Sequence, residues 1–412
     1  MSEGRSVAPL TPRRPWQGRN ILLGVTGGIA AYKSVQIARD LSQLGASVDV
    51  ILTSSAREFV GAITFEAVIG KPVHTDLIAA GHALDHIKLA RHCDVVCVAP
   101  ATADFLARAA SGRADDLLSA VLLATKAPVI VCPAMNDAMW AHPQVQRNAA
   151  HLRDVLGYTL VGPGVGALAY GEGQGAGRME EGGAIIEHIG RALEHDPALR
   201  GKRLVVTAGP TREPVDPVRV ISNRSSGRMG FAIAAAAWRR GADVLLISGP
   251  SSIPEPCGPH IERVETAEQM ANAVRNAIAH ADALIMAAAV ADFRPAAPAQ
   301  SKIKKSASVS AIELEPAPDV LKSTREQRAQ NLKVVGFALE TDAHEENARK
   351  KLAEKGLDMI VLNDATEPGA GFEVSTNKVT LIHKNSTSSE HLPLLSKDEV
   401  ADAILDRLAA LF

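Results

Sequence analysis

Short apolar runs alternate with longer amphipathic segments along most of the chain. In the first half, the apolar runs that predict strands are 20–25, 48–52, 95–99 and 129–132. The segments there that predict helices are 30–44, 115–124 and 180–193. Strands that alternate with helices favour a parallel α/β sheet with helices on both faces. Residues 162–183 are dense in glycine, and we expect a long irregular segment there.

The same alternation restarts near residue 195, after a polar, turn-rich stretch. The later predicted strands are 203–207, 244–248, 284–288, 334–337, 359–362 and 378–383. Helices are expected at 226–240 and 397–411. We therefore predict two α/β domains, residues 19–195 and 196–412, the second a Rossmann-like nucleotide-binding domain. The halves share a strand-turn-helix opening but no repeated sequence.

Composition excludes several classes of protein. The 412 residues are 46% hydrophobic and 22% charged, which is typical of a folded globular chain and not of a disordered one. No apolar run approaches the roughly 18 residues of a membrane span. The net charge of −2 and the 3% of aromatic residues argue against a nucleic-acid partner. The first 18 residues lack the apolar core of a secretion signal, so we expect a cytoplasmic protein.

The four cysteines include no Cys-x-x-Cys pair, which disfavours a zinc knuckle or a dithiol redox site. Buried small hydrophobic side chains are the expectation for Cys97 and Cys132, which lie in apolar runs.

A glycine pair, Gly27 and Gly28, lies where the first strand becomes a helix. Glycines at that point let a phosphate approach backbone N–H groups, although a tight turn alone would also use them. The surrounding sequence is neither a Walker loop nor Gly-x-Gly-x-x-Gly. A later glycine string, 171–177, follows no strand, so a mobile flap is favoured there over a dinucleotide loop.

Polar residues follow the other strands of the first half, where open α/β sheets bind ligands. Asn136 alone would be interpreted as a helix cap. Its surroundings, residues 133–140, match the Pro-x-Met-Asn-x-x-Met-Trp signature of flavin-dependent cysteine decarboxylases. Together with Gly27-Gly28 and Ala101-Thr102, this signature makes the first half similar to phosphopantothenoylcysteine decarboxylase.

The resemblance implies a flavoprotein-type domain and supplies roles for individual residues. Decarboxylation of a cysteine amide needs an electron sink, which FMN provides by oxidising the thiol toward a thioaldehyde; CO2 then leaves, and reduced flavin returns the electrons to the enethiol. His86 would carry the thiol proton, and Asn136 would bind the substrate carboxylate. The implied FMN-binding residues are Gly27, Gly28, Thr53, Ala101, Thr102 and Met135.

One residue departs from the family pattern. The flap of the family reads Ala-Cys-Gly, and its cysteine protonates the enethiol, whereas this chain has Tyr170 in that position. A phenol is a weaker acid than a thiol. The hypothesis is that Tyr170 donates the proton, or that the final reduction is slow or lost.

The second half carries a long motif at 207–219, followed by residues 221–230 with a Ser-Ser-Gly turn. Such a turn before a helix cradles anions, although an ordinary capped helix also begins this way. The combined string closely resembles phosphopantothenate–cysteine ligase. Downstream, a lysine run from Lys302 to Lys305 follows a strand end with Asp292. A solvated face, or a site for a triphosphate and a metal, would explain this run.

The ligase resemblance implies a CTP-dependent amide synthesis. CTP would convert 4′-phosphopantothenate to an acyl cytidylate, Mg2+ would neutralise charge as pyrophosphate leaves, and the cysteine amine would displace CMP. Asn223 would bind the acyl intermediate, Lys302 the transferring phosphate and Asp292 the metal. The implied nucleotide-binding residues are Met286, Ala287, Ala288, Asp292, Lys302, Ala317, Pro318, Asp319, Val320, Phe337, Lys351 and Lys355.

Two details limit this resemblance. Lys351 and Lys355 are one helical turn apart, and without the motif they would be interpreted as surface lysines. Ala317 replaces an asparagine of the family, so one side-chain contact to the nucleotide is missing and backbone groups would have to serve.

Residues 19–410 as a whole resemble the bifunctional enzymes of coenzyme A biosynthesis, in which the ligase product is the decarboxylase substrate. The resemblance implies small-molecule substrates and a homo-oligomer. Three alternatives remain open: a flavin-binding regulatory protein, an active ligase with a silent flavin half, and a pyridine-nucleotide oxidoreductase. The last is disfavoured because no proper dinucleotide loop is present.

Overall fold

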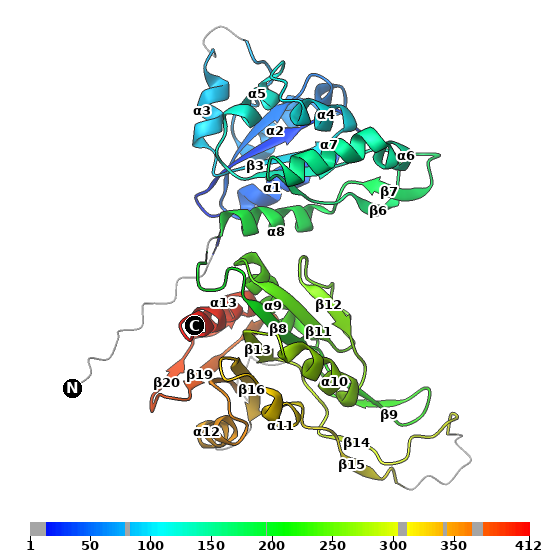
Figure 1. Cartoon of the computed structure of the whole chain (residues 1–412), viewed down its shortest axis with the longest axis vertical. Coiled ribbons are helices and arrows are strands. Elements are labelled where there is room, and N and C mark those ends of the chain that lie inside the picture. Colours follow the sequence, from blue (N-terminus) through cyan, green and yellow to red (C-terminus); the bar gives the residue numbers. More distant parts are fainter. Residues whose placement is uncertain (1–13, 79–82, 195, 304–310, 341–343, 365–373) are drawn as a thin grey trace, which may run out of the picture. The chain divides into compact units, whose positions relative to one another are not determined.

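The computed structural model describes residues 14–78, 83–194, 196–303, 311–340, 344–364 and 374–412. The chain divides into two compact units, an N-terminal unit from Arg14 to Glu194 and a C-terminal unit that holds the described residues from 196 onward (Figure 1). Each unit has its own central sheet.

Five parallel strands form the central sheet in the described part of the N-terminal unit, in the order β2-β1-β3-β4-β5. They are β1 (Asn20–Val25), β2 (Ser47–Leu52), β3 (Val95–Ala101), β4 (Val129–Pro133) and β5 (Thr159–Leu160). Every residue of β3 and β4 is buried, which explains their unbroken apolar sequence. The first four strands lie where the hydrophobic pattern predicted them.

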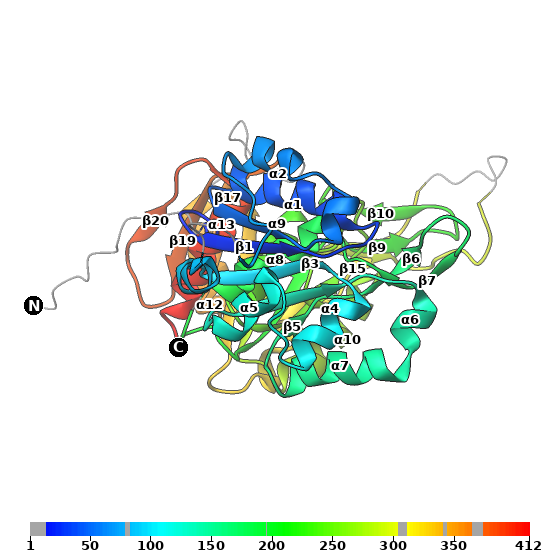
Figure 2. The same cartoon turned by 90° about the horizontal axis from the view of Figure 1, so that it is seen from above.

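Helices cover both faces of this sheet, and each face has its own apolar core. Helices α1, α2 and α8 pack on one face, and α3, α4, α5 and α7 pack on the other. Figure 2 shows α1 and α2 on one side of β1 and β3, and α4, α5 and α7 on the other side. The helices of the unit are α1 (Ala31–Gln43), α2 (Ala62–Ile69), α3 (Asp85–His92), α4 (Ala103–Ala110), α5 (Leu117–Ala124), α6 (Asp137–Ala141), α7 (Pro143–Asp154) and α8 (Gly182–Leu193), with a 3-10 helix η1 (Ala56–Glu58).

The glycine-rich stretch at 162–183 is not irregular throughout, so that expectation was wrong. It contains an antiparallel pair, β6 (Gly164–Ala167) and β7 (Gln174–Arg178). Glycine in β7 allows close packing: a Cβ at Gly177 would lie 2.2 Å from the carbonyl oxygen of Met135. The hydrophobic pattern did not indicate these strands, because glycines supply no alternating apolar side chains.

Eight strands form the main sheet in the described ranges of the C-terminal unit, in the order β12-β11-β8-β13-β16-β17-β19-β20. They are β8 (Arg203–Ala208), β11 (Asp243–Ser248), β12 (His260–Arg263), β13 (Ala283–Met286), β16 (Lys333–Glu340), β17 (Met359–Asp364), β19 (Val379–His383) and β20 (Ser389–His391). The strands are parallel from β12 through β17, whereas β19 and β20 run antiparallel. The sheet is therefore mixed, which adds two antiparallel edge strands to the Rossmann-like domain that we predicted.

Short antiparallel pairs extend from this sheet: β9 (Arg212–Pro214) with β10 (Val220–Ser222), β14 (Phe293–Pro295) with β15 (Leu314–Pro316), and β18 (Thr376–Asn377) with β21 (Leu395–Ser396). Helices α9 and α13 cover one face of the main sheet, and α10, α11 and α12 cover the other. Their bounds are α9 (Arg228–Arg239), α10 (Ala267–Ile278), α11 (Val320–Ser323), α12 (His344–Glu354) and α13 (Lys397–Ala409), with a 3-10 helix η2 (Arg325–Gln327).

A fully buried arginine joins α9 to α13. The guanidinium of Arg240 lies 2.8 Å from a carboxylate oxygen of Asp402 and 2.8 Å from one of Asp406. A third carboxylate oxygen, of Asp196, lies 3.6 Å from the guanidinium, so a charge can remain in this core because carboxylates compensate it. The packing of α13 on α9 is therefore specified by charge as well as by apolar contact.

Cys97 and Cys132 are buried, as predicted, and the four cysteines are free thiols. Among the described helices, none combines the length and the hydrophobicity that a membrane crossing requires.

Candidate active sites

A cavity of about 840 Å³ opens at the carboxyl ends of strands β1 to β4 in the N-terminal unit. Its volume lies within the usual range of small-molecule sites. The segment that follows each of these strands contributes to the lining, and so do the two sides of the β6–β7 pair. Six residues from the sequence prediction meet here: Gly27, Gly28, Thr53, Thr102, Met135 and Asn136.

The glycine loop is shaped for an anion. A Cβ at Gly27 would lie 2.2 Å from Cβ of Ser55, so only glycine permits this approach between two strand ends. The N-cap residue of helix α1, Ala30, makes no side-chain hydrogen bond, so no side chain caps the start of this helix. The Nζ atom of Lys33 is buried, makes no hydrogen bond to any described residue, and lies 3.7 Å from Glu181. Together these features fit the phosphate of FMN.

Asn136 combines the two roles that the sequence left open. It is the N-cap of α6, and its Oδ1 accepts a hydrogen bond from the backbone N–H of Ala138 at 2.9 Å. Because the oxygen is engaged by the helix, the amide N–H2 is the group that Asn136 offers to a ligand in the cavity. Thr102 likewise caps α4 while lining the cavity.

Three predicted residues do not join this lining. Ala101 is buried at the end of β3, where its carbonyl accepts from Ala134. His86 lies in the first turn of α3, and its buried Nδ1 has no hydrogen-bond partner among the described residues. The side chain of Tyr170 is fully exposed, whereas its neighbours Ala169 and Glu172 line the cavity.

The sequence interpretation missed a charged cluster in the same wall. Arg108 of α4 lines the cavity and forms ion pairs with Asp104 at 2.9 Å and Asp116 at 3.4 Å. The i, i+4 spacing of Asp104 and Arg108 was a signal for this contact.

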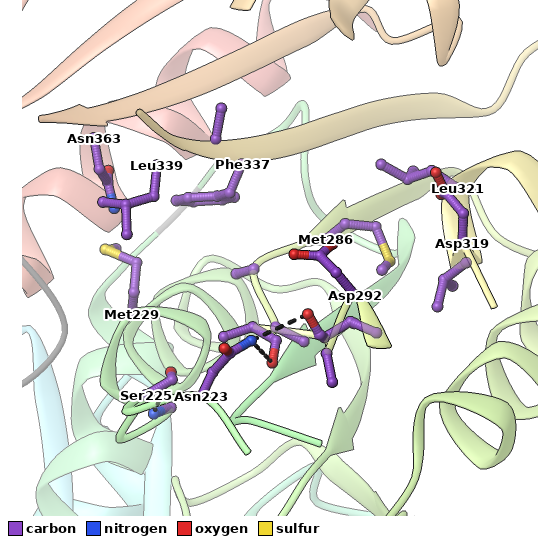
Figure 3. A pocket seen from close by; sticks show the side chains of 18 of the residues that line it. Asn223, Ser225, Met229, Met286, Asp292, Asp319, Leu321, Phe337, Leu339 and Asn363 are labelled. Carbon is purple, nitrogen blue, oxygen red and sulfur yellow. Dashed lines mark hydrogen bonds between the residues drawn. The ribbon is translucent and has the colours of Figure 1, made fainter. Parts of the chain in front are cut away.

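A second cavity, of about 540 Å³, lies in the C-terminal unit at the ends of β13, β16 and β17 (Figure 3). The predicted residues that line it are Asn223, Met286, Ala287, Ala288, Asp292, Ala317, Pro318, Asp319, Val320, Phe337, Lys351 and Lys355. They come from separate stretches of sequence between residues 223 and 355.

Asn223 connects two of these stretches. Its Nδ2 donates hydrogen bonds to the carbonyl oxygens of Ala289 and Val290, both at 3.1 Å (Figure 3). The loop before α9 is thereby tied to the segment that carries Asp292. Oδ1 of Asn223 is left as an acceptor for a ligand.

Backbone contacts compensate in part for the alanine at position 317. The N–H of Ala317 donates to the carbonyl oxygen of Asp292 at 2.9 Å, so this segment is held without an asparagine side chain. Asp319 caps α11 and forms an ion pair with Lys355 at 3.3 Å. One lysine of the i, i+4 pair therefore faces a carboxylate across the cavity.

Lys302 does not line the cavity, and its side chain is exposed. The adjacent Ile303 is held elsewhere: its N–H donates to Asp216 at 3.2 Å, and its carbonyl accepts from Arg219 at 3.1 Å. Arg219 and surrounding backbone N–H groups hold the pKa of Asp216 far below its usual value, so this anchor stays ionised. Lys304 and Lys305 lie outside the described residues.

Within the described ranges, no three His, Cys, Asp or Glu residues cluster as metal ligands. The carboxylates of Asp292 and Asp319 line the cavity. One or two carboxylates suffice for Mg2+ when substrate phosphates complete its coordination, so the residues present fit a metal that arrives with a nucleotide.

The sequence interpretation also missed one end of this cavity. Asn363, Asn377 and Lys397 line it, and Lys397 is only 4% exposed. No motif marks these residues, because each reaches the cavity through the packing of β17, β18 and α13.

Family models match both halves of the chain. Residues 10–194 match the Flavoprotein model, and residues 199–411 match the model for the DNA/pantothenate metabolism flavoprotein C-terminal domain. A crystal structure of the C-terminal domain of a coenzyme A biosynthesis bifunctional protein CoaBC is 41% identical; it covers 52% of this chain and 98% of that chain, with a TM-score of 0.45.

Two curated relatives match nearly the whole length. The coenzyme A biosynthesis bifunctional protein CoaBC of Mycobacterium tuberculosis (strain ATCC 25618 / H37Rv) is 46% identical over 409 residues, which cover 95% of this chain and 97% of that protein. CoaBC of Bacillus subtilis (strain 168) is 44% identical over 398 residues, with coverage of 95% and 97%. At this identity and coverage, the chain belongs to the CoaBC family of bifunctional coenzyme A biosynthesis proteins.

Proposed function

We propose that this chain carries out two consecutive reactions: CTP-dependent ligation of 4′-phosphopantothenate with cysteine in the C-terminal cavity, and FMN-dependent decarboxylation of the product in the N-terminal cavity. The observation that carries the proposal is the convergence of separate motifs on one cavity in each unit. Each cavity lies at the carboxyl ends of parallel strands, where α/β sheets bind ligands.

In the N-terminal cavity, FMN would be held by the glycine loop, with Lys33 and the uncapped start of α1 at its phosphate. Bound FMN supplies a reversible acceptor for two electrons. The amide N–H2 of Asn136 would hold the substrate carboxylate until CO2 leaves. His86 would take the thiol proton, which requires its ring to reach the substrate from α3.

In the C-terminal cavity, Asp292 would hold Mg2+ and thereby counter the negative charge of the CTP phosphates. Lys351 and Lys355 would bind the nucleotide phosphates from α12. Asn223 would place the acyl group beside the segment that it holds through Ala289 and Val290. The amine of cysteine then attacks the activated carbonyl, and CMP leaves with the electron pair of the broken C–O bond.

Mass analysis of the product tests both halves in one reaction. The purified protein is supplied with 4′-phosphopantothenate, cysteine, CTP and Mg2+, and 4′-phosphopantetheine is the expected product. Omission of CTP should abolish the reaction, whereas supplied 4′-phospho-N-pantothenoylcysteine should still be decarboxylated. A colourless protein that contains no FMN, or CTP that stays intact with both acceptors present, would contradict the proposal.

A homo-oligomer is part of the proposal, and light scattering on the purified chain measures it. His86 and Lys302 lie outside the linings of their cavities, so loop movement or a neighbouring copy must bring them to a substrate. A monomer with both activities would leave loop movement as the explanation.

A further inference from the structure

Two helices of the C-terminal unit contribute neighbouring side chains to the lining of its cavity. Residues 319–321, where α11 begins, line the cavity, and so do Lys351 and Lys355 from the end of α12. The carboxylate of Asp319 and the Nζ atom of Lys355 are 3.3 Å apart, so the two contributions meet. Figure 3 shows Asp319 and Leu321 on the same side of the cavity. The position of the Lys355 ammonium group therefore depends on how α12 is placed against α11.

Apolar packing brings these two helices together. Val320 and Leu321 of α11 share an apolar core with Ala348 and Leu352 of α12. Apolar side chains of suitable size tolerate several arrangements, whereas a hydrogen bond requires a narrow range of distances and angles. Directional contacts are therefore needed where the position of a charged group matters.

Arg328 supplies such contacts from the segment between α11 and β16. One nitrogen of its guanidinium, Nη1, donates to the carbonyl oxygen of Lys355 at 2.9 Å and to that of Gly356 at 3.2 Å. The other, Nη2, donates to the carbonyl oxygen of Leu321 and, at 3.3 Å, to the hydroxyl of Thr324. A single side chain thereby joins the end of α12 to the end of α11.

An arginine is suited to this position for two reasons. The last carbonyl groups of a helix have no partner within the helix, and they lie at the negative end of its dipole, where a cation is favourable. The planar guanidinium also donates in two directions at fixed angles, which an ammonium group does not. Arg328 therefore sets the spacing of the two helix ends, while the Asp319–Lys355 ion pair joins the same helices at the cavity.

We propose that Arg328 is a positioning residue for nucleotide binding: it holds the backbone carbonyl group of Lys355 and thereby places the ammonium group of that residue at the cavity. The inference rests on the proposed ligase function, in which Lys355 binds CTP. Arg328 itself does not line the cavity, so it acts through Lys355 and not by contact with the nucleotide. Loss of Arg328 should therefore weaken CTP binding more than it slows the reaction of bound CTP.

The kinetics of CTP-dependent pyrophosphate release by the full-length protein test this role. We expect R328M to raise the KM for CTP about tenfold, with kcat and the KM for cysteine within twofold of the wild type. Calorimetric titration with CTP and Mg2+ should show the same loss of affinity without turnover. R328K keeps the charge without the planar fork, so its KM for CTP should rise only about threefold. R328K carries the test if R328M does not fold.

R349M is the matched control. Arg349 lies on α12 and does not line the cavity. Its guanidinium donates to the carbonyl oxygens of Ser386 at 3.0 Å and Thr387 at 2.9 Å, and to the hydroxyl of Ser389 at 2.9 Å. R349M thus removes a similar set of hydrogen bonds from the same helix, and we expect it to lower the Tm but leave the KM for CTP unchanged. The same result for R328M and R328K would show a merely structural role and overturn the proposal.

A double-mutant cycle tests whether Arg328 acts through Lys355. K355M removes the ammonium group but keeps the carbonyl group that Arg328 binds. If Arg328 positions that ammonium group, R328M should raise the KM for CTP less in the K355M background than in the wild type. Two effects that multiply fully would overturn the positioning of Lys355. If the wild type neither binds CTP nor releases pyrophosphate, the proposed function itself fails, so the two failures are distinguishable.

Discussion

Each cavity lies at the carboxyl ends of the parallel strands of its own unit, but the two are assembled from residues that are separated by different distances along the chain. In the N-terminal unit, most of the predicted residues follow closely on a strand of the central sheet, as Thr53 follows β2 and Asn136 follows β4 by three residues. In the C-terminal unit, one end of the cavity is formed by Asn377 of β18 and Lys397 of α13. Both elements come after the parallel strands of the main sheet in the chain. Local motifs therefore describe the first cavity more fully than the second.

The polar residues also have different local duties. Asn136 and Thr102 are helix caps as well as cavity residues, so each of them also stabilises the helix that it begins. Asn223 instead joins two segments that are distant in the sequence. Lys397 places a positive charge at the N-terminus of α13, where the helix dipole makes it unfavourable. The C-terminal cavity thus carries more residues that local stability does not explain.

The largest expected effect comes from N136D. Aspartate keeps the N-cap acceptor but replaces the amide donors with a charge that repels the substrate carboxylate. We expect the rate of decarboxylation to fall about 100-fold, with ligation unchanged and 4′-phospho-N-pantothenoylcysteine accumulating in the mass spectrum. N148D, on α7 and outside the lining, is the control. Normal decarboxylation by N136D would remove the amide from the mechanism.

N223D should have the next largest effect, in the other unit. The substitution removes the donors to Ala289 and Val290 and places a carboxylate against two carbonyl oxygens. We expect CTP-dependent release of pyrophosphate to fall about 30-fold. Decarboxylation of supplied intermediate should persist, and N331D, an exposed change in the same unit, should be neutral. Equal loss of both activities would indicate misfolding instead.

Lys397, in the C-terminal cavity, should make the free energy of unfolding depend on pH. Its folded-state pKa of about 8 lies below the ordinary value of 10.5, so the unfolded chain binds more protons between these pH values. The free energy of unfolding should therefore gain about 2 kcal/mol from this residue as the pH rises from 8 to 10. Urea titrations at both pH values should show this gain in the wild type and a smaller one in K397M. Equal gains in the wild type and in K397M would show that the pKa of Lys397 is not the cause.

The smallest expected effect concerns Tyr170. If the phenol donates the last proton, Y170F should raise the ratio of oxidised enethiol product to 4′-phosphopantetheine about fivefold, and Y170C should lower it. Mass spectrometry resolves the two products by the mass of two hydrogen atoms. The ring of Tyr170 is fully exposed in this structure, so the segment that carries it would have to move for the phenol to reach the substrate. An unchanged ratio in Y170F would exclude Tyr170 as the donor.

Much of this architecture was predictable from local pattern. The buried strands β1 to β4 were recognised from apolar runs, and the family resemblance of both halves is confirmed by relatives of nearly full length. The β6–β7 pair was missed because nearly half of its residues are glycine, and the antiparallel direction of β19 was missed because apolar alternation does not indicate strand direction. The roles of His86, Lys302 and Tyr170 stay predictions.

The amino-acid sequence by itself determined which residues lie at strand ends, since a parallel sheet brings the segments after its strands to one edge whatever their separation. That reasoning placed Gly27, Asn136 and Asp292 at cavities. Only the tertiary structure decided that Lys397 reaches a cavity beside Arg228. The reason is that its position depends on how α13 packs on α9, through contacts such as Arg240 with Asp402, and not on any neighbouring residue in the chain.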